Sequence, residues 1–279
     1  MSIGIMSNSW GREQSLDFLA QKCQQFGLHS LTVESAGWPG LSLDELMAAL
    51  DGYGLRVNAV HGGSGINRVN TEDEARERQT KILEAIETAH TLGCRIVNTY
   101  CGSHPARDSK AEEMAWYTRW MAPCLDRAAQ RGVTIALETE FDRVGKELTR
   151  TAEATLRLLE AMPGLKLNMD AANVYVAGEE PYPYAYELLK DHIAYLHAKN
   201  ATKFRPGVHD HLRERIYRST QGEFVMVPLP EGAVNWRGLA SALVRDGYDG
   251  DIAIESETIL ELTDSYHQIG ADYLRSLGL

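Results

Sequence analysis

Hydrophobic residues along the chain form two kinds of pattern, and the two kinds alternate. Short apolar runs bounded by polar residues or glycine are typical of buried β-strands. They predict strands at Ile3–Ser7, Ser30–Glu34, Val57–His61, Ile96–Tyr100, Thr134–Glu138, Lys166–Asp170, Ile193–His197 and Ile252–Glu255. The longer stretches between them have apolar residues at three- and four-residue spacing, as in helices that pack one face on a sheet. The clearest predicted helices are Glu13–Phe26, Leu43–Tyr53, Glu72–Leu92, Glu112–Gln130, Ala152–Met162 and Trp236–Arg245.

Glycine marks the ends of many of these helices. A glycine after a helix can take the left-handed conformation that ends it. Such residues precede a predicted strand at Gly27, Gly54, Gly93, Gly132, Gly164 and Gly247. Strands that alternate with helices form a parallel sheet, and eight such units predict a closed (β/α)8 barrel, or TIM barrel, of the α/β class. No GxGxxG motif follows the first strand, which argues against an open dinucleotide-binding sheet.

The length of 279 residues is typical of one such barrel. No stretch rich in proline, serine or charge divides the chain, so we expect residues 1–279 to form a single domain. One connection is unusually long, because residues 200–232 separate the seventh predicted strand from the next helix. Long connections in compact domains are usually functional or interfacial. We expect a substrate lid or a subunit contact there, the latter in a homo-oligomer such as a dimer or tetramer.

The net charge of −11 limits the partners that the protein can bind. Nucleic-acid binding depends on basic residues that neutralise phosphates, and no block of lysine or arginine occurs, so we expect no nucleic-acid partner. We also expect no membrane association, since no apolar run is long enough to span a bilayer. The N-terminal residues lack the pattern of a secretion signal, which favours a cytoplasmic protein. The four cysteines lack CxxC spacing and are expected to be reduced core thiols.

Four predicted strands end in a residue that can bind a metal ion. Glu138, Asp170, His197 and Glu255 each follow an apolar run at the C-terminal end of a strand. The active sites of these barrels lie at that end, where the loops converge. Three carboxylates brought together there would repel one another unless protons or a cation were present. The set, with one imidazole, favours one divalent metal ion, with Mn2+ expected first and Mg2+, Co2+ or Zn2+ as alternatives.

The sequence around these four residues resembles the xylose isomerase-like superfamily of sugar isomerases and epimerases. The resemblance rests on the runs IALETE, LNMDAANVYVAG, YLHAKN, PLPEGAVNW and IAIESE. It covers essentially the whole chain and is strongest over residues 133–257. It implies that the four residues hold one divalent metal ion, and that Glu138 and Glu255 also act as acid and base on either side of the substrate.

The chemistry of such a centre agrees with that implication. A divalent metal can stabilise the enediolate that forms when a proton leaves the carbon next to a carbonyl. A carboxylate can remove that proton and another can return it, to the same carbon or to its neighbour. We therefore expect a metal-dependent isomerase or epimerase whose small-molecule substrate is a sugar, a keto-sugar or a cyclitol.

Three positions depart from the pattern of ketohexose 3-epimerases in that superfamily. Those enzymes typically have Glu six residues after the first metal Glu, His three after the Asp, and Arg six after the metal His. Here the positions hold Val144, Asn173 and Lys203. Asn173 and Lys203 still offer a polar group to a substrate, whereas the Val144 side chain does not. A free ketohexose is therefore not the expected substrate, and inosose isomerases and dehydratases are also similar.

Five further residues are candidates for contact with the substrate. His61 ends the third predicted strand, and we expect it to hydrogen-bond the substrate. Glu34 ends the second and either orients His61 or a substrate hydroxyl, or forms a buried ion pair. Trp10 and Trp38 follow the first two strands and either form an apolar wall for a sugar or pack in the core. Lys199 lies two residues after His197, on the same side of its strand, where it could neutralise the carboxylates or contact a substrate oxygen.

Other functions remain open from the sequence. A lyase or dehydratase acting on a keto-sugar or keto-inositol would use the same centre, with His61 or Lys199 as the acid. A non-catalytic sugar-binding barrel would bind its ligand without exchange of the α-hydrogen. An endonuclease IV-like role is disfavoured because such enzymes use many more histidines. Phosphorylated substrates are not excluded, since the long connection contains Arg205, Arg213 and Arg215.

Overall fold

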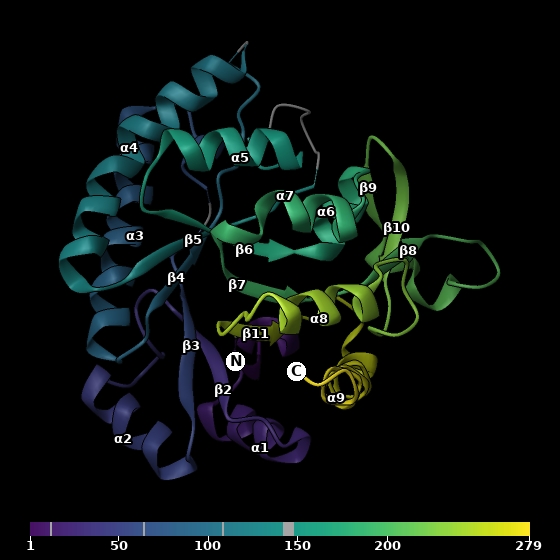
Figure 1. Ribbon diagram of the computed structural model, residues 1–279. Helices are drawn as coiled ribbons and strands as arrows, with labels where there is room; N and C mark the ends of the chain where they lie inside the picture. The colour runs from purple at the N-terminus through teal and green to yellow at the C-terminus, as the bar shows by residue number, and fades with distance from the viewer. Residues whose placement is uncertain (12, 64, 108, 142–147) are drawn as a thin grey trace.

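A closed parallel barrel forms the centre of the computed structural model (Figure 1), which describes residues 1–11, 13–63, 65–107, 109–141 and 148–279. Going round the barrel, the strands are ordered β1-β11-β7-β6-β5-β4-β3-β2. Their bounds are β1 Ser2–Ile5, β2 Ser30–Glu34, β3 Arg56–His61, β4 Ile96–Thr99, β5 Thr134–Glu138, β6 Leu165–Asp170, β7 Ile193–Ala198 and β11 Asp251–Ile254. The pairing of β1 with both β2 and β11 closes the ring, so the predicted TIM barrel is confirmed.

Helices surround the barrel and pack their apolar faces on the strands (Figure 1). Their bounds are α1 Leu16–Phe26, α2 Leu43–Tyr53, α3 Glu72–Thr91, α4 Lys110–Arg131, α5 Ala152–Ala161, α6 Ala171–Ala177, α7 Tyr186–Leu189, α8 Trp236–Arg245 and α9 Leu260–Ser276. Local sequence sets several of these ends. At the start of α2, the Ser42 hydroxyl accepts a hydrogen bond from the Glu45 backbone, and the Glu45 carboxylate accepts one from the Ser42 backbone. Gly54 ends the helix with a φ of 66°.

The interior of the barrel is filled by side chains from alternate positions of the strands. Ala59, Ala136, Tyr195 and Ala253 form a small buried cluster with Met6. A single large ring among alanines fills this layer, and the Tyr195 hydroxyl donates to Asn58 Oδ1 at 3.1 Å. Because side chains alternate along a strand, the next inward position after each of these strand residues lies at the barrel mouth.

The connection at residues 200–232 has structure of its own. It contains β8 Ala201–Lys203, the 3-10 helix η5 Asp210–Arg215, β9 Tyr217–Ser219 and β10 Gly222–Met226. The three strands form a small antiparallel sheet in the order β8-β10-β9. Phe224 and Met226 of β10 pack against Ala172 and Val176 of α6, so this sheet covers the short helix that follows β6.

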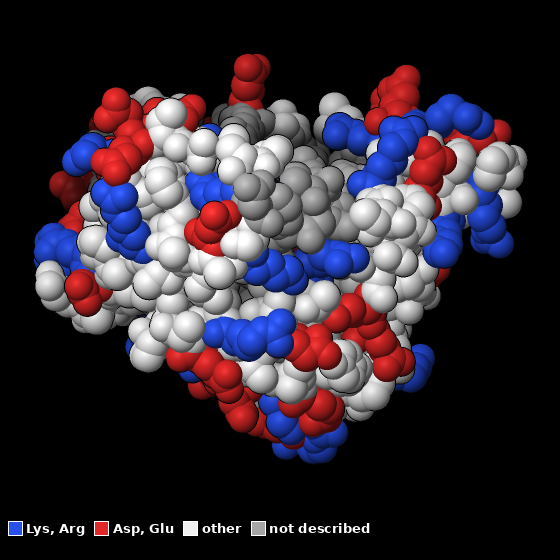
Figure 2. Space-filling view, turned by 90° about the horizontal axis from the view of Figure 1, so that it is seen from above, with Lys and Arg blue, Asp and Glu red and all other residues white. Residues whose placement is uncertain are grey.

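Basic and acidic side chains are mixed on the face seen in Figure 2. Over the described ranges, every helix is too short or too polar to traverse a lipid bilayer.

Candidate metal centre

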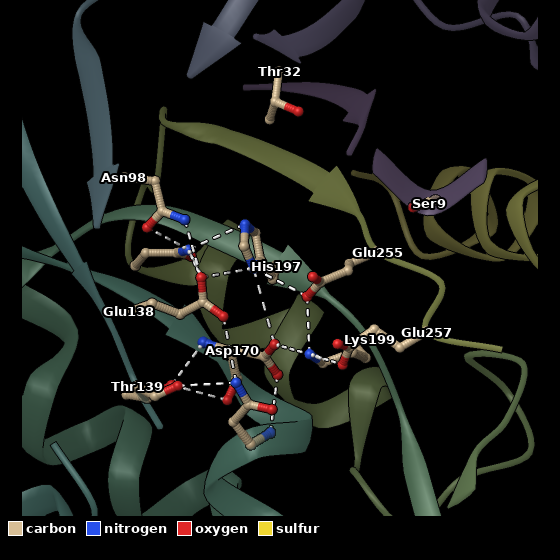
Figure 3. A network of polar contacts seen from close by, with 12 residues as sticks. Ser9, Thr32, Asn98, Glu138, Thr139, Asp170, His197, Lys199, Glu255 and Glu257 are labelled. Carbon is tan, nitrogen blue, oxygen red and sulfur yellow. Dashed lines mark hydrogen bonds and ion pairs between the residues drawn. The ribbon is translucent and has the colours of Figure 1, made fainter. Parts of the chain in front are cut away.

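Strand alternation brings the four predicted ligands to one point at the barrel mouth. Glu138 lies two residues after the inward-facing Ala136, and His197 two residues after Tyr195. Glu255 follows Ala253 in the same way, and Asp170 follows Asn168. Figure 3 shows the resulting cluster, with Glu138 and Glu255 approaching the centre from opposite sides.

The ligand atoms are close enough to bind one ion. One donor atom from each of Glu138, Asp170, His197 and Glu255 lies within 4.8 Å of all the others. His197 Nδ1 is 3.4 Å from Glu138 Oε2, 3.9 Å from Asp170 Oδ2 and 3.3 Å from Glu255 Oε2. All four side chains are at most 8% exposed. A buried group of three carboxylates and one imidazole matches the donors that bind Mn2+, Co2+ or Zn2+.

The electrostatics of the cluster show that a positive charge belongs at its centre. Burial disfavours the charged form of His197, but Glu138 and Glu255 outweigh it and raise its pKa to about 10. Burial raises the pKa of Asp170, Lys199 opposes this rise and repulsion from Glu255 and Glu138 supports it, so that the pKa is about 7. His197 Nδ1 faces the three carboxylates without a well-formed hydrogen bond. The residues therefore fit a divalent cation, which would take the place of these protons.

Amide and hydroxyl groups hold the ligands in position. Asn98 donates to Glu138 Oε2 at 2.9 Å, and Asn173 donates to Glu138 Oε1 at 3.3 Å. Asn168 contacts His197 Nε2 at 3.1 Å, and Thr139 is hydrogen-bonded to the backbone of Asp170. These contacts fix the direction of Glu138 and His197 and hold the strand end at Asp170, as supporting residues do in metal centres. Asn173 therefore lies beside the centre, where it was predicted to act.

Lys199 is the basic residue nearest to the centre in the described part of the chain. Its ammonium lies 2.7 Å from Asp170 Oδ2, 2.9 Å from Glu255 Oε2 and 2.9 Å from Glu257 Oε2. The side chain is 3% exposed. Burial opposes the charge, but the surrounding carboxylates hold the pKa of Lys199 well above its usual value. Lys199 is thus a fixed positive charge that neutralises part of the cluster.

The cluster opens into a cavity of about 680 Å3. Predicted residues in its wall are Glu34, His61, Glu138, Asn173, Lys199 and Glu255. His61 Nδ1 is 3.5 Å from Glu34 Oε2, and its ring packs on the edge of Tyr100. A volume of this size accommodates a small-molecule substrate, and its polar wall suits a polyhydroxylated one.

Two other residues singled out from the sequence lie away from the described cavity wall. Trp10 is buried between Phe26 and His267, and its indole donates to Asp264 at 2.7 Å. Lys203 is exposed on β8 and does not line the described cavity. Val144 lies outside the described residues. Substrate contact by Trp10 and Lys203 stays a prediction.

Two carboxylates in the cavity wall were not singled out from the sequence. Glu140 is buried, forms an ion pair with Arg68 and accepts a hydrogen bond from the Gly102 backbone at 2.6 Å. Glu257 pairs with Lys199. Both lie two residues beyond a metal-ligand candidate, in the runs Glu138-Thr-Glu140 and Glu255-Ser-Glu257. Continued alternation past the strand end was therefore a signal that could have identified them.

The chain belongs to the xylose isomerase-like TIM barrel family, because the family model matches residues 19–277. A comparison with curated protein sequences gave no match. Among solved structures, a D-tagatose 3-epimerase-like protein is similar, with 23% identity, a TM-score of 0.75 and coverage of 100% of this chain and 98% of the other.

Two further solved structures share the fold. The IOLI protein with a binding zinc atom has 18% identity and a TM-score of 0.77, covering 99% of this chain and 96% of the other. The probable 3-DHS dehydratase AsbF of Bacillus anthracis, involved in petrobactin synthesis, has 19% identity and a TM-score of 0.72, covering 96% and 98%. At identities this low, the similarity of these structures establishes a shared fold alone.

Proposed function

We propose that the protein is a divalent-metal-dependent isomerase or epimerase of a sugar, keto-sugar or cyclitol. The observation that supports this most directly is the pair of glutamates, Glu138 and Glu255, on opposite sides of the centre (Figure 3). Both have an oxygen within 3.4 Å of His197 Nδ1, so they face the same small volume. Two carboxylates placed this way can serve as base and acid on either side of one substrate.

The proton transfer is assigned to these two carboxylates. Burial works to raise the pKa of Glu138, but attraction to His197 outweighs it and lowers the pKa. Burial is likewise outweighed at Glu255, where Lys199 and His197 lower the pKa. Both groups are therefore ionised at neutral pH and able to accept a proton from the carbon next to a carbonyl. When bound, a divalent metal would supply Lewis-acid stabilisation of the enediolate.

The remaining groups of the cavity bind and orient the substrate. His61 and Glu34 offer donors and acceptors to hydroxyl groups on one side, and Glu257 does so next to Lys199. Asn173 positions Glu138 by donating to Oε1. Each hydroxyl bound in this way fixes the reacting carbon relative to the two glutamates, which is the main contribution of binding to catalysis.

The charges in the cavity wall support a neutral substrate. The described basic side chains there are Arg68, Lys81 and Lys199. Arg68 pairs with Glu140, Lys81 with Glu77, and Lys199 with three carboxylates. A phosphate would have to compete with these partners for its cations, so we propose that the substrate carries none.

Mn2+ is proposed as the native metal, with Mg2+, Co2+ and Zn2+ as alternatives. Three hard carboxylate oxygens favour Mn2+ or Mg2+, and the imidazole of His197 favours the transition metals over Mg2+. The zinc in the IOLI structure shows that the fold can hold that ion in a relative. The cytoplasmic location and a dimeric or tetrameric assembly, with residues 200–232 as lid or interface, belong to the same proposal.

Elimination of water is the second candidate reaction. Lys199 and His61 line the cavity and could give a proton to a departing hydroxyl group. The barrel also resembles that of a probable dehydratase. The two reactions share the removal of the α-proton and differ in the mass of the product, because only dehydration loses water.

Exchange of the substrate α-hydrogen in heavy water tests the proposal. Protein loaded with Mn2+ is incubated with a panel of ketoses and keto-inositols, and deuterium uptake is followed by NMR and mass spectrometry. We expect uptake at the carbon next to the carbonyl of at least one substrate. Glu138→Gln and Glu255→Gln should each slow it by about 100-fold or more, because each variant lacks one of the two proton-transfer groups.

A matched variant separates this effect from general damage. Glu160→Gln changes an exposed glutamate on α5 and should leave the exchange rate unaltered. Tight binding of a sugar without any exchange would instead identify a non-catalytic binding barrel. Unchanged exchange in both active-site variants would refute the roles of Glu138 and Glu255.

A further inference from the structure

A second cavity lies beside the main one. It has a volume of about 380 Å3 and is formed by the segments that follow β1 and β2. The segment after β2 supplies an apolar wall made of Ala36, Trp38, Pro39 and Leu41. Ala36 and Pro39 are exposed and the other two are half-buried, so their apolar surfaces are available to a ligand.

The two cavities are adjacent and share part of their walls. Asn8, from the 3-10 helix η1 Ser7–Trp10, and Glu34, at the end of β2, line both of them. These are polar residues on the side of the main cavity where His61 lies. A molecule whose hydroxyl groups contact Glu34 and His61 therefore lies next to the apolar wall.

The apolar wall is held in a fixed shape. The Gly37 backbone donates to the Glu34 carbonyl at 2.9 Å and closes a tight turn. Gly37 has a φ of 83°, and a Cβ there would lie 2.8 Å from Leu43 Cδ2, so the turn requires glycine. Trp38 follows at once and packs partly on the hydrophobic core. The cavity is thus formed before any ligand binds.

We propose that the second cavity binds an apolar substituent, aromatic or alkyl, attached to the neutral sugar that occupies the main cavity. The substrate class is then a keto-sugar derivative such as a keto-glycoside, with its polar ring near the metal centre and its apolar group against Trp38; simple glycosides are its non-reacting analogues. This inference rests on the proposed function for the position of the ring. The apolar wall offers a free hydroxylated sugar few partners, whereas an apolar group gains by leaving water there.

Matched pairs of glycosides test this assignment. Methyl and phenyl β-D-glucopyranosides, with the corresponding galactosides and mannosides, are titrated into the full-length protein loaded with Mn2+. Isothermal titration calorimetry then gives the dissociation constants. We expect the phenyl member of at least one pair to bind about tenfold tighter than its methyl partner, because the ring buries apolar surface.

Two variants place the effect in the second cavity. Ala36→Phe fills the space with a side chain on an exposed position, and Trp38→Ala removes the main aromatic surface. Each should reduce the preference for phenyl over methyl to about twofold or less. Ala48→Phe introduces the same ring at an exposed position on α2 that does not line the cavity, and should keep the preference.

Several results would overturn the inference. Equal affinities within every pair, including no measurable binding of either member, would do so. Phenol that binds as tightly as the phenyl glycosides would show a site unconnected with a sugar. A change of sedimentation coefficient in Trp38→Ala without loss of the preference would assign the wall to a second copy of the chain. Deuterium exchange with unsubstituted ketoses reports on the proposed function separately, so either idea can fail alone.

Discussion

At the scale of single residues, Lys199 determines how the carboxylates coexist without a metal. Its ammonium contacts Asp170, Glu255 and Glu257 within 2.9 Å. Removing one partner from a buried group of charges leaves the others uncompensated. Lys199→Met should therefore lower the free energy of unfolding of the metal-free protein by about 3–5 kcal/mol. Urea denaturation in the presence of a chelator measures this loss.

A lysine at the surface provides the control. Lys190 pairs with Glu187 and Asp246 at the protein surface, where solvent screens the charges. Lys190→Met should therefore lower the free energy of unfolding much less than Lys199→Met does. Added Mn2+ should restore more stability to Lys199→Met than to the wild type, because the ion then meets unneutralised carboxylates. Equal gains in both proteins would show that Lys199 does not neutralise the centre.

The sequence identified the part of the site that strand alternation controls. Glu138, Asp170, His197 and Glu255 end inward-facing strand positions, and Lys199 continues the same alternation. Arg68 was not found, because it ends the short 3-10 helix η2 Ile66–Arg68 in the connection after β3, and sequence alone does not show which way such a residue points. Its pairing with Glu140 depends on a contact between residues that are 72 positions apart.

At the scale of elements, helix α9 is joined to the end of β11 through a buried histidine. His267 Nδ1 lies 2.9 Å from the Ser256 hydroxyl and 2.9 Å from the Thr263 carbonyl. Its ring packs on Trp10 at 4.3 Å between centroids. Ser256 directly follows Glu255, so this contact supports the strand end that carries a ligand.

The same histidine makes stability depend on pH. Burial lowers the pKa of His267 from 6.5 to about 4 in the folded protein. Between those values the unfolded chain binds a proton that the folded protein does not, so stability falls as pH decreases through this window. The loss should reach about 3 kcal/mol near pH 4. Denaturant unfolding at pH 7 and pH 4.5 measures it.

Comparison with His267→Phe isolates this contribution from the other titrating groups. Phenylalanine keeps the ring contact with Trp10 but binds no proton, so the variant should lose less stability between the two pH values. It should be less stable than the wild type at pH 7, because the polar contacts of Nδ1 with Ser256 and Thr263 are lost. An identical pH dependence in both proteins would contradict the assignment.

The bounds of helices and strands were predicted well where the pattern of apolar residues within the segment itself determines them. β2, β5, α2 and α8 have the predicted bounds, and most other elements of the barrel differ by one or two residues at their ends. The sheet formed by β8, β9 and β10 was not predicted, because its strands are short and pair only within the long connection. The short helix α6 was also missed, since it begins at once after β6, where the Asp170 side chain caps it.

At the scale of the whole molecule, metal binding is coupled to protonation. The pKa of His197 is raised to about 10 and that of Asp170 to about 7, so both can hold protons that a metal must displace. Metal affinity should therefore rise with pH, by roughly tenfold per unit for each proton released. Calorimetric titration with Mn2+ at pH 6 and pH 8 should show about a 100-fold or greater difference.

The number of released protons gives an independent check. Titrations in buffers of different ionisation enthalpy should detect roughly one proton at pH 8 and up to about two at pH 6. The thermal midpoint at saturating Mn2+ should rise more at pH 8 than at pH 6, since a ligand that binds only the folded state stabilises it in proportion to its affinity. An affinity independent of pH would rule out this coupling.

The metal-ligand candidates and the apolar wall of the second cavity come from different strands of the barrel. The metal-ligand candidates come from β5, β6, β7 and the end of β11, whereas the apolar wall comes from the segment after β2. No ligand candidate lies on β1 or β2. Residues 35–41 can therefore change without disturbing the metal-ligand candidates, whereas residues 7–11 include Trp10, which packs on His267 beside the end of β11. In evolutionary and engineering terms, this arrangement would let the proposed catalytic groups acquire new substrates by exchange of one short loop.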